Sequence, residues 1–272
     1  MSNGEGVPVT WQNPVRTFLK EGKPVVGITI TAGCVEMAAQ AANLGFDFLW
    51  VEMEHSPITL ETTRQIVLAT RGLKALPFVR VPVNEFWTAK RVLDAGALGV
   101  IFPFVSSAEA AHKAVQGCKY PPLGRRGSGA GLATFRWPGA ESYYDFADRN
   151  VLVVVIIEER EAVENLEQIA ATPGVDVLFV GTSDLAFSLG LRGRNDDPQV
   201  ARALDKVVEA ARRHGKFAGA PVSSADQARQ FIDKGLLFLQ TLTELRFMAA
   251  GATQFLEPLG KSAAQVKTQP LY

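Results

Sequence analysis

Two carboxylates in the middle of this sequence stand where buried strands would end, and their placement is the first indication of chemistry. Glu158 directly follows the apolar run Val151–Ile157, and Asp184 comes shortly after the run Val177–Val180. Unbroken apolar runs are typical of parallel strands buried on both faces, and ligands collect at the carboxyl ends of such strands. Two carboxylates on neighbouring strands suit a hard divalent cation such as Mg²⁺ or Mn²⁺. The sequence therefore predicts a metal site there.

Other polar residues follow further apolar runs and add complementary chemistry. Arg80, in PFVRVP, carries a planar fork that can bind a substrate carboxylate through two parallel hydrogen bonds. His55, in EMEHSP, is a candidate general base because its intrinsic pKa lies near neutrality. The backbone amides of Ser183 and Asp184 would hold an oxyanion or a carboxylate if a helix begins there.

Each of these residues has an alternative structural role. Glu158 alone would pair with a neighbouring Arg or Lys, Asp184 would cap the helix that follows it, and Arg80 would form a surface ion pair. Their coincidence at one end of the expected sheet is what favours a functional site. The apolar runs contain no lysine, which argues against a Schiff-base mechanism. Nucleotide-binding loops and serine-nucleophile motifs are also missing from suitable contexts.

Short apolar runs alternate with helical patterns along the chain, which predicts an α/β fold of the (β/α)₈ TIM-barrel type. The expected strands are Val25–Ile30, Phe46–Val51, Leu76–Val81, Gly99–Phe104, Leu152–Ile157, Val177–Val180, Phe217–Ala220 and Leu237–Thr241. The expected helices are Cys34–Leu44, Leu60–Arg71, Phe86–Ala95, Ala108–Gly117, Arg160–Ala171, Gln199–His214, Ala225–Lys234 and Leu245–Phe255. A glycine precedes several strands, as in LGFDFLW and KGLLFLQ, and we expect it to end the preceding helix in the left-handed conformation.

We expect a single barrel domain over 1–272, with an N-terminal extension at 1–23 and a peripheral C-terminal tail at 257–272. A long connection, Lys119–Asn150, separates the fourth of these helices from the fifth strand and is rich in Gly, Pro, Arg and aromatic residues. A connection of this length is usually functional or part of an interface, so a lid or a subunit contact is the expected role.

The charge balance argues for a small-molecule partner. Lys+Arg and Asp+Glu number 28 each, so no overall field would draw the chain to nucleic acid or to an anionic membrane. The N-terminal residues lack the basic and apolar regions of a signal peptide, and no apolar run is long enough to span a membrane. From these features we expect a cytoplasmic protein.

Several ordered phrases resemble one enzyme family, the HpcH/HpaI class II pyruvate aldolases. The resemblance covers nearly all of Val25–Leu256 and rests on EHSP, VRVP, VLDAGALGVIFPFV, YPPLGRRG, EEREAVENL and VDVLFVGTSDLAFSLG. It implies reversible cleavage of a 4-hydroxy-2-keto acid to pyruvate, or a related 2-keto acid, and an aldehyde through a metal-bound enolate. It also implies a divalent metal cofactor, Mg²⁺, Mn²⁺ or Co²⁺, and a hexamer built as a trimer of dimers. In such hexamers the last helix is exchanged and neighbouring subunits help to form the site.

The resemblance also assigns roles to individual residues. Glu158 and Asp184 resemble the metal ligands, Arg80 the group that binds the pyruvate carboxylate, and His55 the acid/base residue with Asp94 as its supporting partner. Asp94 lies in a helical pattern and is a candidate through the resemblance alone. The substrate pocket would be lined by Gly181, Ser183, Asp184 and Trp50.

Two departures from the family pattern leave alternatives open. Ile156 stands where many members carry Gln, and Trp50 together with the aromatic residues of the long connection resembles macrophomate synthase, which decarboxylates oxaloacetate. The alternatives are therefore an oxaloacetate-decarboxylating enzyme, a citrate-lyase-like acyl-CoA lyase, and a non-enzymatic keto-acid-binding scaffold. The aromatic residues would otherwise pack a loop or an interface.

Overall fold

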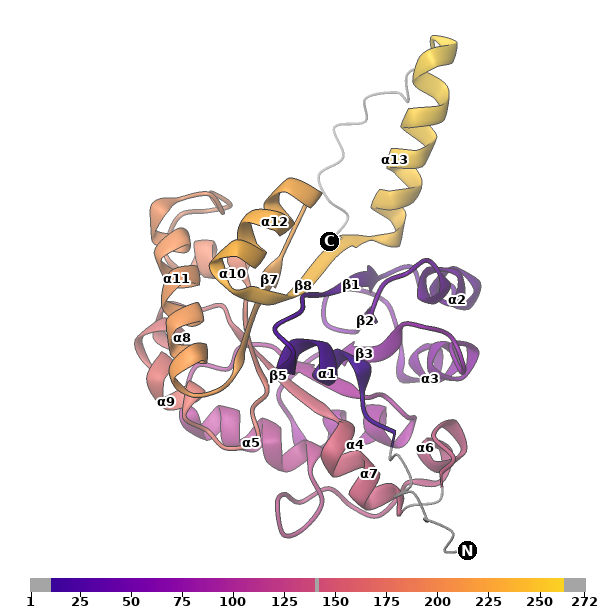
Figure 1. Ribbon diagram of the computed structural model, residues 1–272, viewed down its shortest axis with the longest axis vertical. Helices are drawn as coiled ribbons and strands as arrows, with labels where there is room; N and C mark the ends of the chain where they lie inside the picture. Colours follow the sequence, from indigo (N-terminus) through magenta and orange to yellow (C-terminus); the bar gives the residue numbers. More distant parts are fainter. Residues whose placement is uncertain (1–10, 140–141, 262–272) are drawn as a thin grey trace, which may run out of the picture.

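Eight parallel strands close into a barrel in the computed structural model, which describes residues 11–139 and 142–261 (Figure 1). Each strand pairs with its neighbours in sequence, and β1 pairs with β8 to close the barrel. The strands are β1 (Val25–Ile30), β2 (Phe48–Glu52), β3 (Leu76–Arg80), β4 (Gly99–Phe102), β5 (Leu152–Ile157), β6 (Val177–Val180), β7 (Phe217–Pro221) and β8 (Leu236–Thr243). The predicted TIM barrel is thus confirmed.

Helices surround the barrel and join its strands. They are α1 (Pro14–Lys20), α2 (Val35–Asn43), α3 (Leu60–Ala69), α4 (Phe86–Asp94), α5 (Ala108–Cys118), α6 (Gly131–Arg136), α7 (Tyr143–Asn150), α8 (Arg160–Glu164), α9 (Leu166–Ala170), α10 (Thr182–Ser188), α11 (Pro198–Arg213), α12 (Ala225–Lys234) and α13 (Glu244–Leu256), with a 3₁₀ turn η1 (Glu257–Leu259). The glycines expected to end helices have left-handed φ values, for example 112° at Gly45 and 101° at Gly235.

The ends of several elements differ from the sequence prediction. β4 ends at Phe102 rather than at Phe104, because Pro103 has no N–H to donate and Phe104 adopts a φ of 51°. The helix expected over Arg160–Ala171 is divided at Asn165 into α8 and α9. The long connection contains two short helices, α6 and α7.

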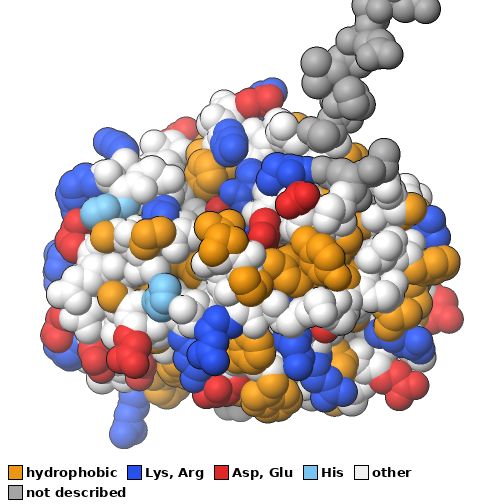
Figure 2. Space-filling view, turned by 90° about the horizontal axis from the view of Figure 1, so that it is seen from below, with side chains coloured by type: hydrophobic (Ala, Val, Ile, Leu, Met, Phe, Trp, Pro, Cys, Tyr) orange, Lys and Arg blue, Asp and Glu red, His pale blue; other side chains and the backbone are white. Residues whose placement is uncertain are grey.

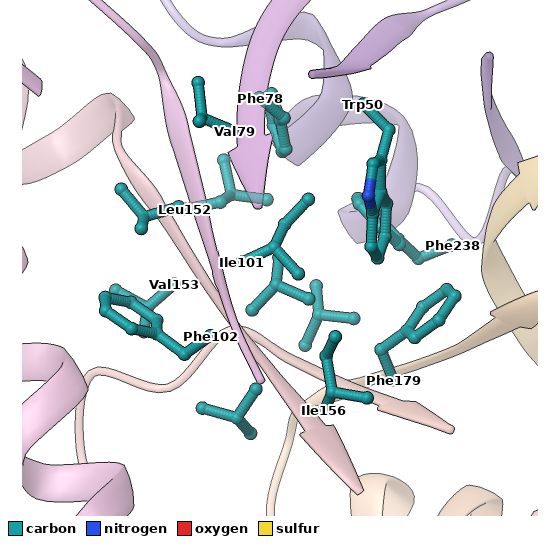
Figure 3. Close-up of a cluster of buried hydrophobic side chains, with 14 of the residues drawn as sticks. Trp50, Phe78, Val79, Ile101, Phe102, Leu152, Val153, Ile156, Phe179 and Phe238 are labelled. Atoms are coloured by element: carbon teal, nitrogen blue, oxygen red, sulfur yellow. The ribbon is translucent and has the colours of Figure 1, made fainter. Parts of the chain in front are cut away.

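Aromatic and aliphatic side chains pack together in the buried core of the barrel (Figure 3). The rings of Phe48 and Phe238 stack with centroids 4.4 Å apart, and those of Trp50 and Phe179 lie 4.9 Å apart. Gly27 makes room for this packing, since a Cβ there would lie 2.1 Å from the Phe48 ring. The interior is therefore a packed core and not an open channel.

The N-terminal segment closes one end of the barrel. Arg16 in α1 forms an ion pair of 2.6 Å with Asp176, just before β6, and the backbone N–H of Asn13 donates to the side chain of Asn150 at 2.7 Å. Positions 1–10 of the predicted extension and 262–272 of the predicted tail lie outside the described residues. Those parts of the domain assignment stay predictions.

The last helix has a different environment from the others. Figure 1 shows α13 projecting away from the barrel, and Glu244 is its only buried residue.

Charged side chains of both signs are spread over the molecular surface that Figure 2 displays, with Lys and Arg interspersed with Asp and Glu. Within the described ranges, no helix has both the length and the apolar character needed to cross a bilayer.

Candidate active site

A cavity of about 700 Å³ opens at the carboxyl ends of the strands. Most of the residues predicted for the site line it, and they come from the ends of β2, β3, β5 and β6 or from the loops that follow. These residues are Trp50, His55, Arg80, Glu158, Gly181, Ser183 and Asp184. The barrel therefore brings together side chains that are more than 100 positions apart in the sequence.

Glu158 stands at the end of β5 and is only 2% exposed. The pKa of Glu158 is raised to about 8, mainly by burial and further by the nearby charges of Glu54 and Asp184. A 2.7 Å hydrogen bond from the backbone N–H of Phe104 has the opposite effect and lowers this pKa. Phe104 donates this bond from a left-handed backbone, a conformation that costs about 1–3 kcal/mol and is characteristic of functional sites.

Gly181 is required by the position of the Glu158 carboxylate. A Cβ at Gly181 would lie 2.6 Å from Glu158 Oε2, so any larger residue would displace that oxygen. Gly181 is also the N-cap residue of α10, and Asp184 lies in the first turn of this helix. The alternative role of Asp184 as the cap itself is therefore wrong, and the expected helix does begin here, at Thr182, with the amides of Ser183 and Asp184 in its first turn.

Arg80 is held by two acids that the sequence prediction left without a role. Its Nε donates to Glu52 Oε2 at 2.6 Å, and its Nη1 lies 3.0 Å from Glu54 Oε2 in an ion pair that lacks an aligned hydrogen bond. The β2–β3 register places Glu52 directly beside Arg80. An acid at the end of one strand and an Arg at the end of the next was the signal available in the sequence.

Glu52 organises the loop after β2 as well as the arginine. Its carboxylate accepts hydrogen bonds from Trp50 Nε1 at 3.1 Å, from the backbone N–H of Glu54 at 2.7 Å and from that of His55 at 2.9 Å. A buried carboxylate with several donors is fixed in place. Glu52 thus sets the positions of both Arg80 and the His55 backbone.

The His55 side chain is free to meet a substrate, since it is 52% exposed and lines the cavity. Its Nε2 lies 3.9 Å from Glu54 Oε1. Burial raises the pKa of Glu54, while the nearby Arg80 and His55 lower it and Glu52 and Asp184 raise it. An exposed histidine on the cavity wall beside a carboxylate is placed to exchange protons with a bound substrate.

Asp94 lies elsewhere in the single chain. It ends α4, receives a 3.0 Å hydrogen bond from the buried Arg126, and lines a second cavity with Arg64 and Arg91. Its pKa is raised by burial, against the effect of Arg126. The structure does not bring Asp94 to His55 within one chain, so a pairing of the two would need a neighbouring subunit.

The acids at the mouth have the chemistry of an incomplete metal site. Glu158 and Asp184 both line the cavity and offer carboxylate oxygens, the ligands that a hard divalent cation prefers. Among the described residues, no group of three or more His, Cys, Asp or Glu side chains forms a complete cage. These two residues fit a cation that takes its other ligands from water and substrate.

The aromatic residues divide between the cavity and the surface of the barrel. Trp50 and Phe179 line the cavity with Ile156, and Figure 3 shows all three in the barrel interior. The described residues of the long connection contribute none of the lining residues. Its Trp137 instead packs on Trp11 with ring centroids 5.4 Å apart, which agrees with the packing alternative for this aromatic cluster.

A closed (β/α)₈ barrel with acids, an arginine and a histidine at the carboxyl ends of its strands has the architecture of a TIM-barrel enzyme. The sequence model of the HpcH/HpaI aldolase/citrate lyase family matches residues 30–249, and the chain belongs to this family. It is therefore a carbon–carbon lyase, as predicted. Members of the family generally use a divalent metal.

The similar proteins include aldolases that match along almost their whole length. A hydroxypyruvate/pyruvate aldolase of Paraburkholderia phytofirmans is 36% identical over 254 residues, which are 91% of this chain and 98% of the relative. A 4-hydroxy-2-oxo-heptane-1,7-dioate aldolase of Escherichia coli is 32% identical over 257 residues, 94% of this chain and 98% of the relative. The structure of a family member from Burkholderia cenocepacia superposes with a TM-score of 0.84 at 31% identity and covers 92% of this chain and 100% of that one.

Proposed function

We propose that this chain catalyses the reversible, metal-dependent aldol cleavage of a 4-hydroxy-2-keto acid to pyruvate, or a related 2-keto acid, and an aldehyde. The observation that carries the proposal is the convergence of Glu158, Asp184 and Arg80 in one cavity beside His55. The aldolase relatives support the same reaction class.

Glu158 and Asp184 would hold the divalent cation, Mg²⁺, Mn²⁺ or Co²⁺. The bound cation would supply the positive charge that offsets negative charge developing on the keto oxygen. Arg80 would bind the keto-acid carboxylate. Its Nε and Nη1 face Glu52 and Glu54, and no hydrogen bond or ion pair among the described residues engages Nη2, which leaves that nitrogen for the substrate.

His55 would remove the proton from the 4-hydroxyl group when the bond between carbons 3 and 4 breaks, and would return a proton in the synthetic direction. Its exposure and its place on the cavity wall support this role. Asp94 would support His55 from a neighbouring subunit. The pocket around the keto acid would be completed by Gly181, Ser183 and Trp50.

The chain would work as a homo-oligomer, a hexamer built as a trimer of dimers. Support comes from α13, where Phe247, Met248 and Phe255 are 40%, 61% and 72% exposed. A helix that leaves large apolar side chains in water is typical of an interaction surface. An exchanged last helix would bury them against a second copy.

The reaction is tested by following pyruvate release from a 4-hydroxy-2-keto acid before and after chelation. We expect EDTA to abolish activity and Mg²⁺, Mn²⁺ or Co²⁺ to restore it. The apolar strand runs contain no lysine that could form an imine with the keto acid, so the proposed reaction depends on the metal to stabilise the enolate. Borohydride with pyruvate should not inactivate. Irreversible trapping by borohydride, or full activity in EDTA, would refute the metal-dependent mechanism.

A further inference from the structure

The mouth of the barrel has two chemically different halves. The ends of β2, β3, β5 and β6 carry the acids and Arg80, whereas the residues that line the cavity at the ends of β7, β8 and β1 are neutral. The neutral half is lined by Thr29, Thr31, Pro221, Gln240 and Thr243. A keto acid held by the charged half would direct the rest of the substrate toward this neutral wall.

Hydrogen bonds fix the orientation of Gln240 within the wall. Its Nε2 donates to the backbone carbonyl of Thr241 at 2.8 Å and to the Thr29 hydroxyl, and Thr29 Oγ1 donates to the same carbonyl at 3.1 Å. Because a carbonyl oxygen only accepts, the NH₂ group must be the one that faces it. Both protons of the Gln240 amide are therefore engaged.

The opposite atom of the same amide remains open to the cavity. No hydrogen bond among the described residues reaches Gln240 Oε1, and Gln240 lines the cavity. The Thr243 hydroxyl accepts from the N–H of Arg246 at 3.2 Å, which leaves its proton to donate. The wall thus offers one fixed acceptor and one donor, the pair that a hydroxyl group matches.

Charge points to the same kind of group. Glu52, Glu54, Glu158 and Asp184 line the cavity with Arg80 as their permanent cation, and Arg80 is already paired with two of them. A second substrate carboxylate at the neutral wall would face the Gln240 oxygen, and none of the residues that line this wall is a cation that could balance it. A neutral hydroxyl group meets no such penalty.

We infer that Gln240, oriented by Thr29 and assisted by Thr243, determines specificity by binding a hydroxyl group on the aldehyde part of the substrate. The aldehyde is then a neutral hydroxyaldehyde, in preference to an apolar or a carboxylated one. This inference rests on the proposed aldol reaction. It concerns the part of the substrate that the metal ligands and Arg80 do not contact.

The test compares kcat/KM in aldol addition of pyruvate to glyceraldehyde, propanal and succinic semialdehyde, with Mn²⁺ present. Wild-type enzyme should prefer glyceraldehyde, and Q240L should lower the ratio of glyceraldehyde to propanal by about 10- to 100-fold, the usual effect of an unmatched hydroxyl. Q65L, a change of the same kind on the exposed face of α3, should leave the ratio unchanged.

Other outcomes separate the inference from the reaction beneath it. Aldol activity with no preference for glyceraldehyde, or with a preference for succinic semialdehyde, overturns the inference and leaves the proposed function standing. Absence of activity with every aldehyde overturns both. If circular dichroism shows that Q240L does not fold, T243V is used in its place. T243V removes only the hydroxyl donor and should lower the ratio of glyceraldehyde to propanal. An unchanged ratio in T243V then counts against the inference.

The hydroxyl group could also belong to the keto acid, and a further comparison distinguishes this source. Hydroxypyruvate and pyruvate are compared with propanal as the fixed acceptor, in wild type and in Q240L. The inference expects Q240L to leave the ratio of hydroxypyruvate to pyruvate unchanged. A fall in that ratio, without a change in the aldehyde ratio, would assign Gln240 to the keto acid and overturn the inference as stated.

Discussion

Glu158 is a carboxylate that the fold withdraws from water and surrounds with other acids. Its pKa of about 8 exceeds the ordinary value of 4.5, first because of burial and then because Glu54 and Asp184 lie close. The carboxyl group of Glu158 therefore keeps its proton up to a higher pH in the folded protein than in the unfolded chain. The stability gained from this difference is fully present below pH 4.5 and is lost as the pH rises through about 8.

If Glu158 holds the cation, as we propose, this shift should make metal binding depend on pH. A cation must displace the Glu158 proton below pH 8, so we expect the affinity for Mn²⁺ to rise about tenfold for each pH unit from 6 to 8 and then to level off. The measurement is the increase in melting temperature on addition of Mn²⁺ at pH 6, 7, 8 and 9. E158Q should lose most of the increase at every pH. Equal increases at pH 6 and pH 9 in the wild type would contradict this account.

Arg80 combines a functional and a structural role, which affects the choice of variant. Removal of its side chain would deprive the buried acids Glu52 and Glu54 of the arginine charge that balances them, at a cost of about 3–5 kcal/mol. R80K keeps the charge but loses the fork, so we expect a fall of about 10²-fold or more in kcat/KM for the keto acid with a much smaller loss of stability. Steady-state kinetics and thermal unfolding measure the two effects. Unchanged kcat/KM in R80K would remove Arg80 from substrate binding.

The sequence predicted which acids lie at strand ends but not the network that supports them. Glu158 and Asp184 were identifiable because an apolar run stops just before each one. The role of Glu52 depends on the β2–β3 register and on a loop that turns two N–H groups back toward it, and neither is visible in a linear pattern. Asp94 is harder still, since it lies away from His55 in a single chain.

At the level of elements, long periodic segments were predicted well and short ones were missed. The 16-residue helix α11 carries buried Val200, Leu204, Val207 and Ala211 at helical spacing, whereas α6 and α10 have only six and seven residues and no clear period. Helices this short depend on tertiary contacts for their stability. In α6, Arg136 provides such contacts by donating to the carbonyls of Val67 and Thr70.

The junction between β8 and α13 shows how one element is tied to another. Glu244 begins α13 and accepts hydrogen bonds from the backbone N–H groups of Thr31 at 2.7 Å and Ala32 at 2.5 Å, just after β1. We expect E244A to destabilise the protein by several kcal/mol, because each N–H left without a partner costs about 1–3 kcal/mol. Thermal unfolding at a fixed protein concentration measures the loss.

E257A provides the matched control for this junction. Glu257 is exposed in η1, and surface substitutions of this kind usually change stability by no more than about 0.5 kcal/mol. The loop after β1 should also exchange its amide hydrogens faster in E244A than in E257A. The same melting temperature in both variants would show that Glu244 does not anchor α13.

In the molecule as a whole, the barrel was predictable from the sequence, whereas the proposed role of α13 depends on contacts outside its own chain. Closure of the barrel follows from eight repeats of the strand–helix pattern, so the fold was recognisable even where the predicted bounds of a strand were wrong. The position of α13 is different, because an amphipathic pattern does not say which molecule covers the apolar face. The same is true of Asp94, whose proposed partner lies outside its own chain.

One experiment can test both the exposed apolar face of α13 and the proposed position of Asp94 beside His55 of a neighbouring subunit. Met248 and Phe255 are seven positions apart, so they lie on the same face of the helix, and both are largely exposed. If they are buried against a second copy, M248D/F255D should place charges in an apolar interface and yield a smaller assembly than the wild type by light scattering. R202D/K206D, a double substitution at exposed positions of α11, should not.

Activity gives this experiment a second readout. If Asp94 supports His55 from a neighbouring subunit, the smaller assembly should lose aldolase activity although its barrel still folds, and the loss should follow dissociation as the protein is diluted. A wild-type chain that is monomeric, or a double variant with wild-type mass, would contradict a role of α13 in assembly. Full activity in a dissociated variant would instead mean that each barrel is complete alone and that Asp94, held by Arg126 in its separate cavity, takes no part in the reaction.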